Sequence, residues 1–314
     1  MADNATVRRA ILLALFVLVL CVPLLGEAFY TRLATRILIF GLIALSLDLI
    51  LGYGGMISFG HAAFVGLGAY ATAILTFHGV GSAFVVWPAA IVVAAAGALV
   101  IGAISLRTGG VYFIMITLAF AQMLYYAANG IEEYGAGEGL RMPARNSFLG
   151  AVDMADPVQF FYLTAALFIV VFFVATRLVA SRFGQVLLGI KTNERRMRAL
   201  GFETYRYKLT AFAIAGALAG LGGALDANLN AYVSPAMLHW VLSGDLLVML
   251  ILGGVGTLAG PVLGAGAFLI LEEALSGVTR HWMAIFGPLM LLVILFHRGG
   301  IYALLPKRRS TRLP

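Results

Sequence analysis

The longest uncharged stretch of the chain decides its fold. Residues 49–106 read LILGYGGMISFGHAAFVGLGAYATAILTFHGVGSAFVVWPAAIVVAAAGALVIGAISL and contain no Asp, Glu, Lys or Arg. A bilayer crossing takes about 20 apolar residues, so this stretch is long enough to cross twice. Of all 314 residues, 62% are hydrophobic and 11% are charged, whereas a soluble domain has about 25% charged residues. A soluble protein of this size cannot bury so much apolar surface. The sequence therefore predicts a polytopic membrane protein and excludes soluble enzymes and nucleic-acid-binding proteins.

Hydropathy predicts an all-α transmembrane bundle that forms a single domain over residues 1–314. About ten spans are expected, near residues 10–26, 33–51, 57–78, 84–105, 110–128, 158–180, 208–229, 240–254, 258–275 and 282–297. The Gly-rich stretches 52–55 and 253–256 leave the neighbouring span boundaries least defined. Two hydrophilic segments interrupt the pattern, an outer one at 129–157 and an inner one at 181–207.

The basic residues predict the orientation of the chain. The net charge is +7, and with the N-terminus inside, ten spans leave only five of the Lys and Arg residues on the outer side: Arg32, Arg36, Arg141, Arg145 and Arg280. This bias matches the positive-inside rule. Both termini are expected to face the cytoplasm, and the positive charge is explained without nucleic acid.

The inner segment 181–207 has a helical pattern. Its apolar residues follow a helical period, and Lys191, Arg195 and Arg198 repeat at i, i+4 and i+7 on another face. This predicts a short amphipathic helix at the inner membrane surface, ended by Gly201. Composition leaves two interpretations open. The simpler one is a basic loop that sets topology, and the other is a docking element for a cytoplasmic partner.

Glycines interrupt an apolar stretch in each half of the chain, at 52–55 and at 253–256. Paired Gly-interrupted segments in two halves point to a midplane passage built from broken helices. Ser58, His61 and Thr257 flank these breaks and are candidates to line a translocation path. Helix-to-helix hydrogen bonding is the alternative role of each.

The few charged residues inside the spans bear on the energy source of transport. Asp48 lies near the inner end of its span, and Asp226 and Asp245 lie towards the outer side, so none falls at the midplane where an ion-coupled carrier needs a carboxylate. The chain has no nucleotide-binding, zinc-binding or hydrolase motif, so we expect no catalytic residues, no metal and no cofactor of its own. An ion-coupled secondary transporter and a channel-like pore remain the alternatives to a subunit driven by a partner.

One motif adds a family resemblance. Residues 51–70, LGYGGMISFGHAAFVGLGAY, closely resemble the signature of the branched-chain amino acid ABC importer permeases, with the LivM-type subunit nearer. The resemblance covers most of residues 37–300 and continues through Asn193-Glu194, residues 199–201, 215–220, 232–235 and 252–265. It departs from the family at 134–140, which keeps the glycines but not the hydroxyl residues, and at 297–300.

The resemblance implies partners and roles. The inner segment would be the coupling loop that docks into an ATPase subunit, through Gly189, Lys191, Asn193, Glu194, Arg195, Ala199, Leu200 and Gly201. The implied complex, in a bacterial inner membrane, has a second homologous permease subunit, two cytoplasmic ATPase subunits that bind ATP and Mg, and a periplasmic substrate-binding protein on the outer loop. The implied cargo is a branched-chain amino acid, or a related solute such as urea, an amide or an aromatic acid.

Overall fold

The computed structural model describes residues 4–148, 154–277, 281, 284–288, 290 and 299–304, and helices account for most of them. The α-helices are α1 (Asn4–Leu20), α2 (Ala28–Asp48), α3 (His61–Phe77), α4 (Ala83–Ser105), α5 (Val111–Gly130), α6 (Pro157–Ala180), α7 (Arg182–Ala199), α8 (Thr204–Asn230), α9 (Trp240–Gly253) and α10 (Ala259–Ser276). Short turns are η1 (Val22–Leu25), the π-helical η2 (Leu49–Tyr53), η3 (Glu132–Tyr134), η4 (Ala136–Glu138), η5 (Pro235–Leu238) and η6 (Ile301–Leu304). One two-stranded sheet pairs β1 (Leu140–Arg141) with β2 (Tyr232–Val233). The predicted all-α class is confirmed.

Six helical segments of the described chain are long and apolar enough to cross a membrane: α2 with η2, α4, α5, α6, α8 and α10. α3 and α9 are shorter, at 17 and 14 residues, and each adjoins one of the Gly-rich breaks. A helix occupies each predicted span from 33–51 to 258–275. In the predicted first span, 10–26, the α-helix ends earlier, at Leu20, and η1 follows with Pro23 at its start. The predicted span 282–297 lies largely outside the described residues.

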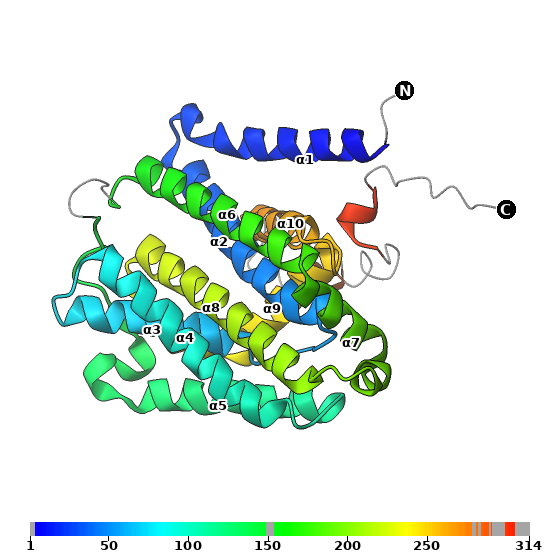
Figure 1. Ribbon diagram of the computed structural model, residues 1–314. Coiled ribbons are helices and arrows are strands. Elements are labelled where there is room, and N and C mark those ends of the chain that lie inside the picture. The colour runs from blue at the N-terminus through cyan, green and yellow to red at the C-terminus, as the bar shows by residue number, and fades with distance from the viewer. Residues whose placement is uncertain are drawn as a thin grey trace.

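Small residues bring α8 close to α3 and α4 in the middle of the bundle (Figure 1). A Cβ atom added to Gly68 would overlap the backbone of Gly220, and one added to Gly220 would overlap the Ala94 side chain. This close approach of backbones is what small-residue faces permit in membrane helices. Gly216 and Gly220, one helical turn apart on α8, therefore have a packing role against α4.

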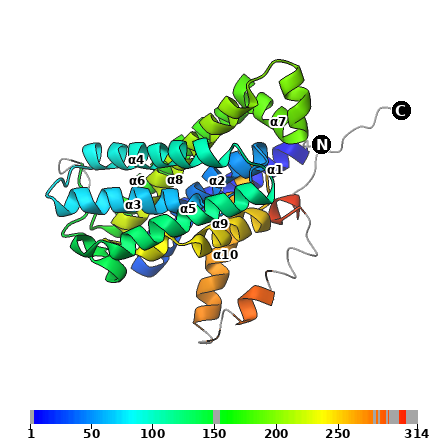
Figure 2. The ribbon, with the colours of Figure 1, turned by 90° about the horizontal axis from the view of Figure 1, so that it is seen from below.

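α8 connects two structurally different ends of the molecule. Its 27 residues extend for about 40 Å at 1.5 Å per residue. α7 lies at its first end, and Figure 2 shows the segment between α5 and α6 at the opposite end. There β1 pairs with β2, and the side chains of Asn146 and Asn228 are joined by a 2.8 Å hydrogen bond. The predicted inner and outer hydrophilic segments are thus a whole helix apart.

Candidate functional site

α7 is a helical hairpin and not the single amphipathic helix that the sequence predicts. Asn193 has φ −158° and ψ 95°, which breaks the helix. Its Oδ1 accepts a 2.9 Å hydrogen bond from the backbone N–H of Arg196 and so begins the second arm. The two arms pack where the Met197 side chain lies against Gly189. Asn competes with the helical backbone for hydrogen bonds and favours caps, which explains the break.

The hairpin ends at Gly201, as predicted. Gly201 has φ +88°, a conformation that glycine adopts at little cost. The N–H of Gly201 donates to the carbonyl of Arg198, and the N–H of Phe202 donates to the carbonyl of Met197. This is the Schellman arrangement, which satisfies the last carbonyls of a helix. α8 then begins at Thr204, only a few residues later.

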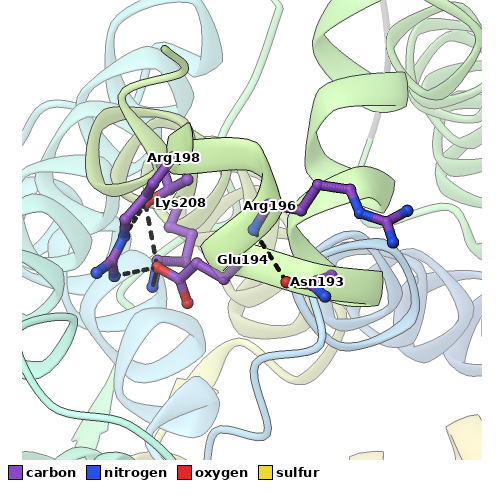
Figure 3. Close-up of polar contacts among 6 residues, drawn as sticks. Asn193, Glu194, Arg196, Arg198 and Lys208 are labelled. Atoms are coloured by element: carbon purple, nitrogen blue, oxygen red, sulfur yellow. Dashed lines mark hydrogen bonds and ion pairs between the residues drawn. The ribbon is translucent and has the colours of Figure 1, made fainter. Parts of the chain in front are cut away.

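Glu194 joins the second arm of the hairpin to α8 (Figure 3). Its Oε1 accepts from Arg198 Nη2 at 2.6 Å, from Lys208 Nζ at 2.8 Å and from Thr204 Oγ1 at 3.1 Å. Partial burial opposes ionisation of this carboxyl, but the hydrogen bonds from Lys208 and Arg198 outweigh it and lower the pKa of Glu194. Charge-assisted hydrogen bonds are stronger than neutral ones. The hairpin is therefore held at a defined angle to α8.

The first arm of the hairpin is joined to the π-helical turn η2. Lys191 Nζ donates a 2.6 Å hydrogen bond to the carbonyl of Gly52. The stem of Lys191 lies over Gly55, where an added Cβ would stand 3.0 Å from Lys191 Cγ. Leu187 and Ile190 of the same arm are buried. The amphipathic prediction holds for this arm, since its apolar side packs on the bundle.

The two Gly-rich breaks meet each other beside η2. Asp48 Oδ1 accepts from the N–H of Gly256 at 2.7 Å, and Asp48 Oδ2 accepts from the N–H of Leu258 at 3.2 Å. Tyr53 Oη donates to the carbonyl of Gly256 at 3.1 Å. A Cβ on Gly52 would overlap the Asp48 carboxylate and stand 2.8 Å from Gly256 Cα. We call this contact, formed by Asp48, Gly52, Tyr53, Gly256 and Leu258, the glycine junction.

The eight predicted coupling residues divide into two groups. Arg195, Ala199 and Leu200 are exposed on the hairpin, and Leu200 is 66% exposed. The other five make the contacts within the chain described above, and so build the hairpin or tie it to the bundle: Gly189, Lys191, Asn193, Glu194 and Gly201.

The three predicted path residues do not come together around one cavity. Ser58 Oγ accepts from the N–H of Gly60 at 3.1 Å, and Thr257 Oγ1 accepts from the N–H of Gly260 at 3.0 Å. His61 Nε2 lies 2.8 Å from Ser46 Oγ. Ser58 and His61 have no exposed surface within the chain. Ser58 and Thr257 thus begin or shape helices locally, and their role in a path stays a prediction.

Comparison with known proteins identifies the family to which the chain belongs. The family model described as "Branched-chain amino acid transport system / permease component" matches residues 29–295. The chain belongs to this family. It is similar to the high-affinity branched-chain amino acid transport system permease proteins LivM of Salmonella typhimurium and Escherichia coli. Each is 29% identical over 324 aligned residues, which cover 95% of this chain and 76% of the relative. A probable LivM permease of Methanocaldococcus jannaschii is 25% identical over 83% of this chain and 89% of its own length. No solved structure matches the chain.

Because the chain belongs to this family, it is a multi-pass transport permease. Residues 51–70, which carry the resemblance, lie in the glycine junction and in the first part of α3.

Sequence reasoning missed several residues of the site. Lys208 and Thr204 complete the Glu194 cluster, but they stand 14 and 10 positions from Glu194 and carry no periodic signal. The sequence shows Asp48 as a charge inside a span, but nothing in it pairs Asp48 with Gly256. Among the described residues, no group of three or more His, Cys, Asp or Glu is placed to hold a metal.

Proposed function

We propose that this permease is the membrane-spanning subunit of an ATP-binding-cassette importer that takes up branched-chain amino acids in a bacterial inner membrane. It would act with a second homologous permease, two cytoplasmic ATPase subunits that bind ATP and Mg, and a periplasmic binding protein. The names of the similar LivM proteins support this cargo. The hairpin end would face the cytoplasm together with both termini, as the positive-inside pattern predicts.

The observation that carries the proposal is the link from the hairpin to the glycine junction. Lys191 Nζ bonds to the Gly52 carbonyl, and the Gly52 backbone lies against Asp48 and Gly256. Packed elements of this kind shift as rigid bodies and not by gradual bending. A push on α7 by an ATPase subunit would therefore reach the broken helices directly, where a permease needs to open and close.

The outer surface of the hairpin has the composition of a docking site. Leu188, Leu200 and Phe202 are exposed apolar side chains, 42%, 66% and 36% exposed, and Arg195 and Arg196 are exposed beside them. Cores of protein interfaces are rich in large apolar residues and Arg. This surface suits a cleft with an apolar floor and an acidic rim on the ATPase subunit.

The opposite end would receive the substrate from the periplasmic protein. Glu132, Glu133 and Glu138 are exposed there, on a segment that β1 and β2 hold in place. Ser58, His61 and Thr257 remain our candidates for the path between two permeases. Because Ser58 and His61 are buried within the chain, they would line it only after the junction opens.

The first experiment separates this proposal from an ion-coupled carrier or a pore. The purified chain, alone and together with the ATPases, second permease and binding protein, is placed in vesicles, and uptake of L-leucine is measured. Only the complete assembly supplied with ATP is expected to accumulate leucine. Accumulation by this chain alone, driven by an ion gradient, would contradict the proposal.

The second experiment tests the docking surface. Leu200→Glu places a charge on the proposed interface, and truncating or charging a central apolar residue of an interface costs about 2 kcal/mol or more, which weakens association roughly 30-fold. The ATPases are expected to be lost on co-purification. The matched control is Ile131→Glu, which charges another exposed apolar residue, 46% exposed, at the opposite end. ATPases that remain bound to the Leu200→Glu protein would show that α7 is not the docking element.

A further inference from the structure

The segment that follows α8 returns into the bundle before α9 begins. β2 is followed by η5, whose Leu238 is 3% exposed. A Cβ added to Gly66, in α3, would overlap the Leu238 side chain. The non-helical backbone of this segment is therefore held by packing against α3.

A cavity of about 290 Å³ lies between the returning segment and the helices α2, α3, α8 and α9. This is just below the range for small-molecule sites, about 300–1,000 Å³, and suits a small solute. One part of the lining is apolar and the other part is polar: Phe40, Val65, Ala236, Met237 and Leu242, and Asp226, Asn230, Tyr232 and Ser234.

Asp226 supplies a negative charge that hydrogen bonds within the chain satisfy only in part. The residue is only 9% exposed. Asn230 Nδ2 donates a 3.1 Å hydrogen bond to Asp226 Oδ1, and within the described part of the chain Oδ2 accepts none. A carboxylate this deeply buried is costly unless a cation or several donors satisfy it. The free oxygen therefore favours a positively charged group in the cavity.

A positive charge lies close to the same cavity, on a residue just outside its lining. The guanidinium of Arg36 lies 5.6 Å from the centre of the Phe40 ring, and Phe40 is part of the apolar lining. Arg36 also approaches Glu272 at 3.4 Å, a long and partly exposed ion pair of the kind that contributes little. The charge of Arg36 is close enough to act on Asp226. The lining of the cavity thus has a carboxylate and an apolar wall, and a guanidinium lies against the Phe40 ring of that wall.

We infer that this cavity is a binding site for a zwitterionic amino acid with an apolar side chain, occupied on the way through the permease. The substrate ammonium group pairs with Asp226, its carboxylate turns towards Arg36, and its side chain lies against Phe40, Val65 and Leu242. The inference rests on the proposed function, because leucine is chosen as the probe from it. The structural observations that support the site come from the cavity alone. The few polar groups suit a site that must release its ligand.

The test measures protection of a cysteine in the cavity. Ala236, an exposed residue of the lining, is changed to Cys in a Cys21→Ala background, because Cys21 is the chain's one cysteine. The complete membrane complex is labelled with a maleimide in the presence of L-leucine, L-leucinamide or 4-methylpentanoate. At a concentration about ten times Kd, a bound ligand leaves about a tenth of the site free, so labelling slows about ten-fold.

L-Leucine is expected to protect most strongly and L-leucinamide less, while 4-methylpentanoate, which lacks the ammonium group, gives no protection. Asp226→Asn abolishes protection by the two ammonium compounds and leaves labelling without ligand unchanged. Asp245→Asn is the matched control, a carboxylate in α9 outside the lining, and keeps protection. Equal protection by 4-methylpentanoate, or full protection in Asp226→Asn, would overturn the assignment.

ATP-driven uptake is measured in the same preparation so that the two proposals fail separately. Uptake of leucine without protection of the cysteine overturns the cavity site and leaves the proposed function standing. Protection without ATP-driven uptake overturns the proposed function and leaves the cavity site standing.

Discussion

The two ends of this permease treat a buried carboxylate in opposite ways. At the glycine junction, both oxygens of Asp48 accept hydrogen bonds from backbone N–H groups, and the surrounding residues are in close contact. At the far end, Asp226 accepts one side-chain hydrogen bond and lines a cavity of about 290 Å³. The Asp48 carboxylate has a hydrogen-bond donor for each of its oxygens, whereas, among the described residues, the Asp226 carboxylate has a donor for only one.

This difference fits the two proposals, a mechanical role for the glycine junction and a binding role for the cavity. A fully satisfied polar network makes a region rigid, which is what the proposed transmission of motion from the hairpin to the broken helices requires. An incompletely satisfied buried charge costs stability, and proteins retain such charges inside membranes mostly where they serve transport or ligand binding. Variants at Asp48 should therefore lower the stability of the fold more than variants at Asp226, which should mainly weaken ligand binding.

The largest effect is expected from Gly52→Val. The new side chain would overlap the Asp48 carboxylate and crowd Gly256 Cα, and the displaced Asp48 would lose its bonds to the partly buried N–H of Gly256 and the buried N–H of Leu258. Overpacking and lost hydrogen bonds together should destabilise the fold by about 4 kcal/mol or more. The loss of stability is measured by heating the detergent-solubilised protein and following the disappearance of the monodisperse species.

Gly266→Ala is the matched control, because its added Cβ would stand 3.5 Å from Ile37 Cγ2, an ordinary contact. This variant should unfold within about 0.5 kcal/mol of the unmodified protein. A Gly52→Val protein as stable as this control would show that the two glycine breaks are not locked together.

An intermediate effect should separate Asp48→Ala from Asp226→Ala. The first change leaves the N–H groups of Gly256 and Leu258 without their acceptor, at about 1–3 kcal/mol each. The second removes one hydrogen bond from Asn230, an exposed residue, and should cost less than about 1 kcal/mol. Parallel thermal unfolding of the two proteins gives the comparison. Equal losses of stability would end the distinction between a structural and a binding carboxylate.

The sequence predicted the helices well and their contacts poorly. Uncharged runs and the glycine breaks are local patterns, so α2 to α6 and α8 to α10 were found close to their bounds. The position of Asn193 as a helix break was missed because Lys191, Arg195 and Arg198 keep a helical period straight through it. The contacts of Asp48 with Gly256, more than 200 residues away, and the cavity at Asp226 depend on tertiary packing and have no local signal.

The smallest effect concerns the Glu194 cluster, which lies outside the spans and can be tested by pH. Its hydrogen bonds hold the pKa of Glu194 below the ordinary value of 4.5. The stabilisation is therefore complete above about pH 4.5 and is lost as pH falls through the lowered pKa. Since the side chain is 32% exposed, the contribution is about 1 kcal/mol or less.

Hydrogen exchange of residues 193–202 should show protection that falls on acidification. In Glu194→Gln, protection should be lower at neutral pH and should not change further. A hairpin equally protected across this range in both proteins would mean that Asn193 and Gly201 alone fix its shape, and that the bond from Lys208 is not needed to hold α7 against α8.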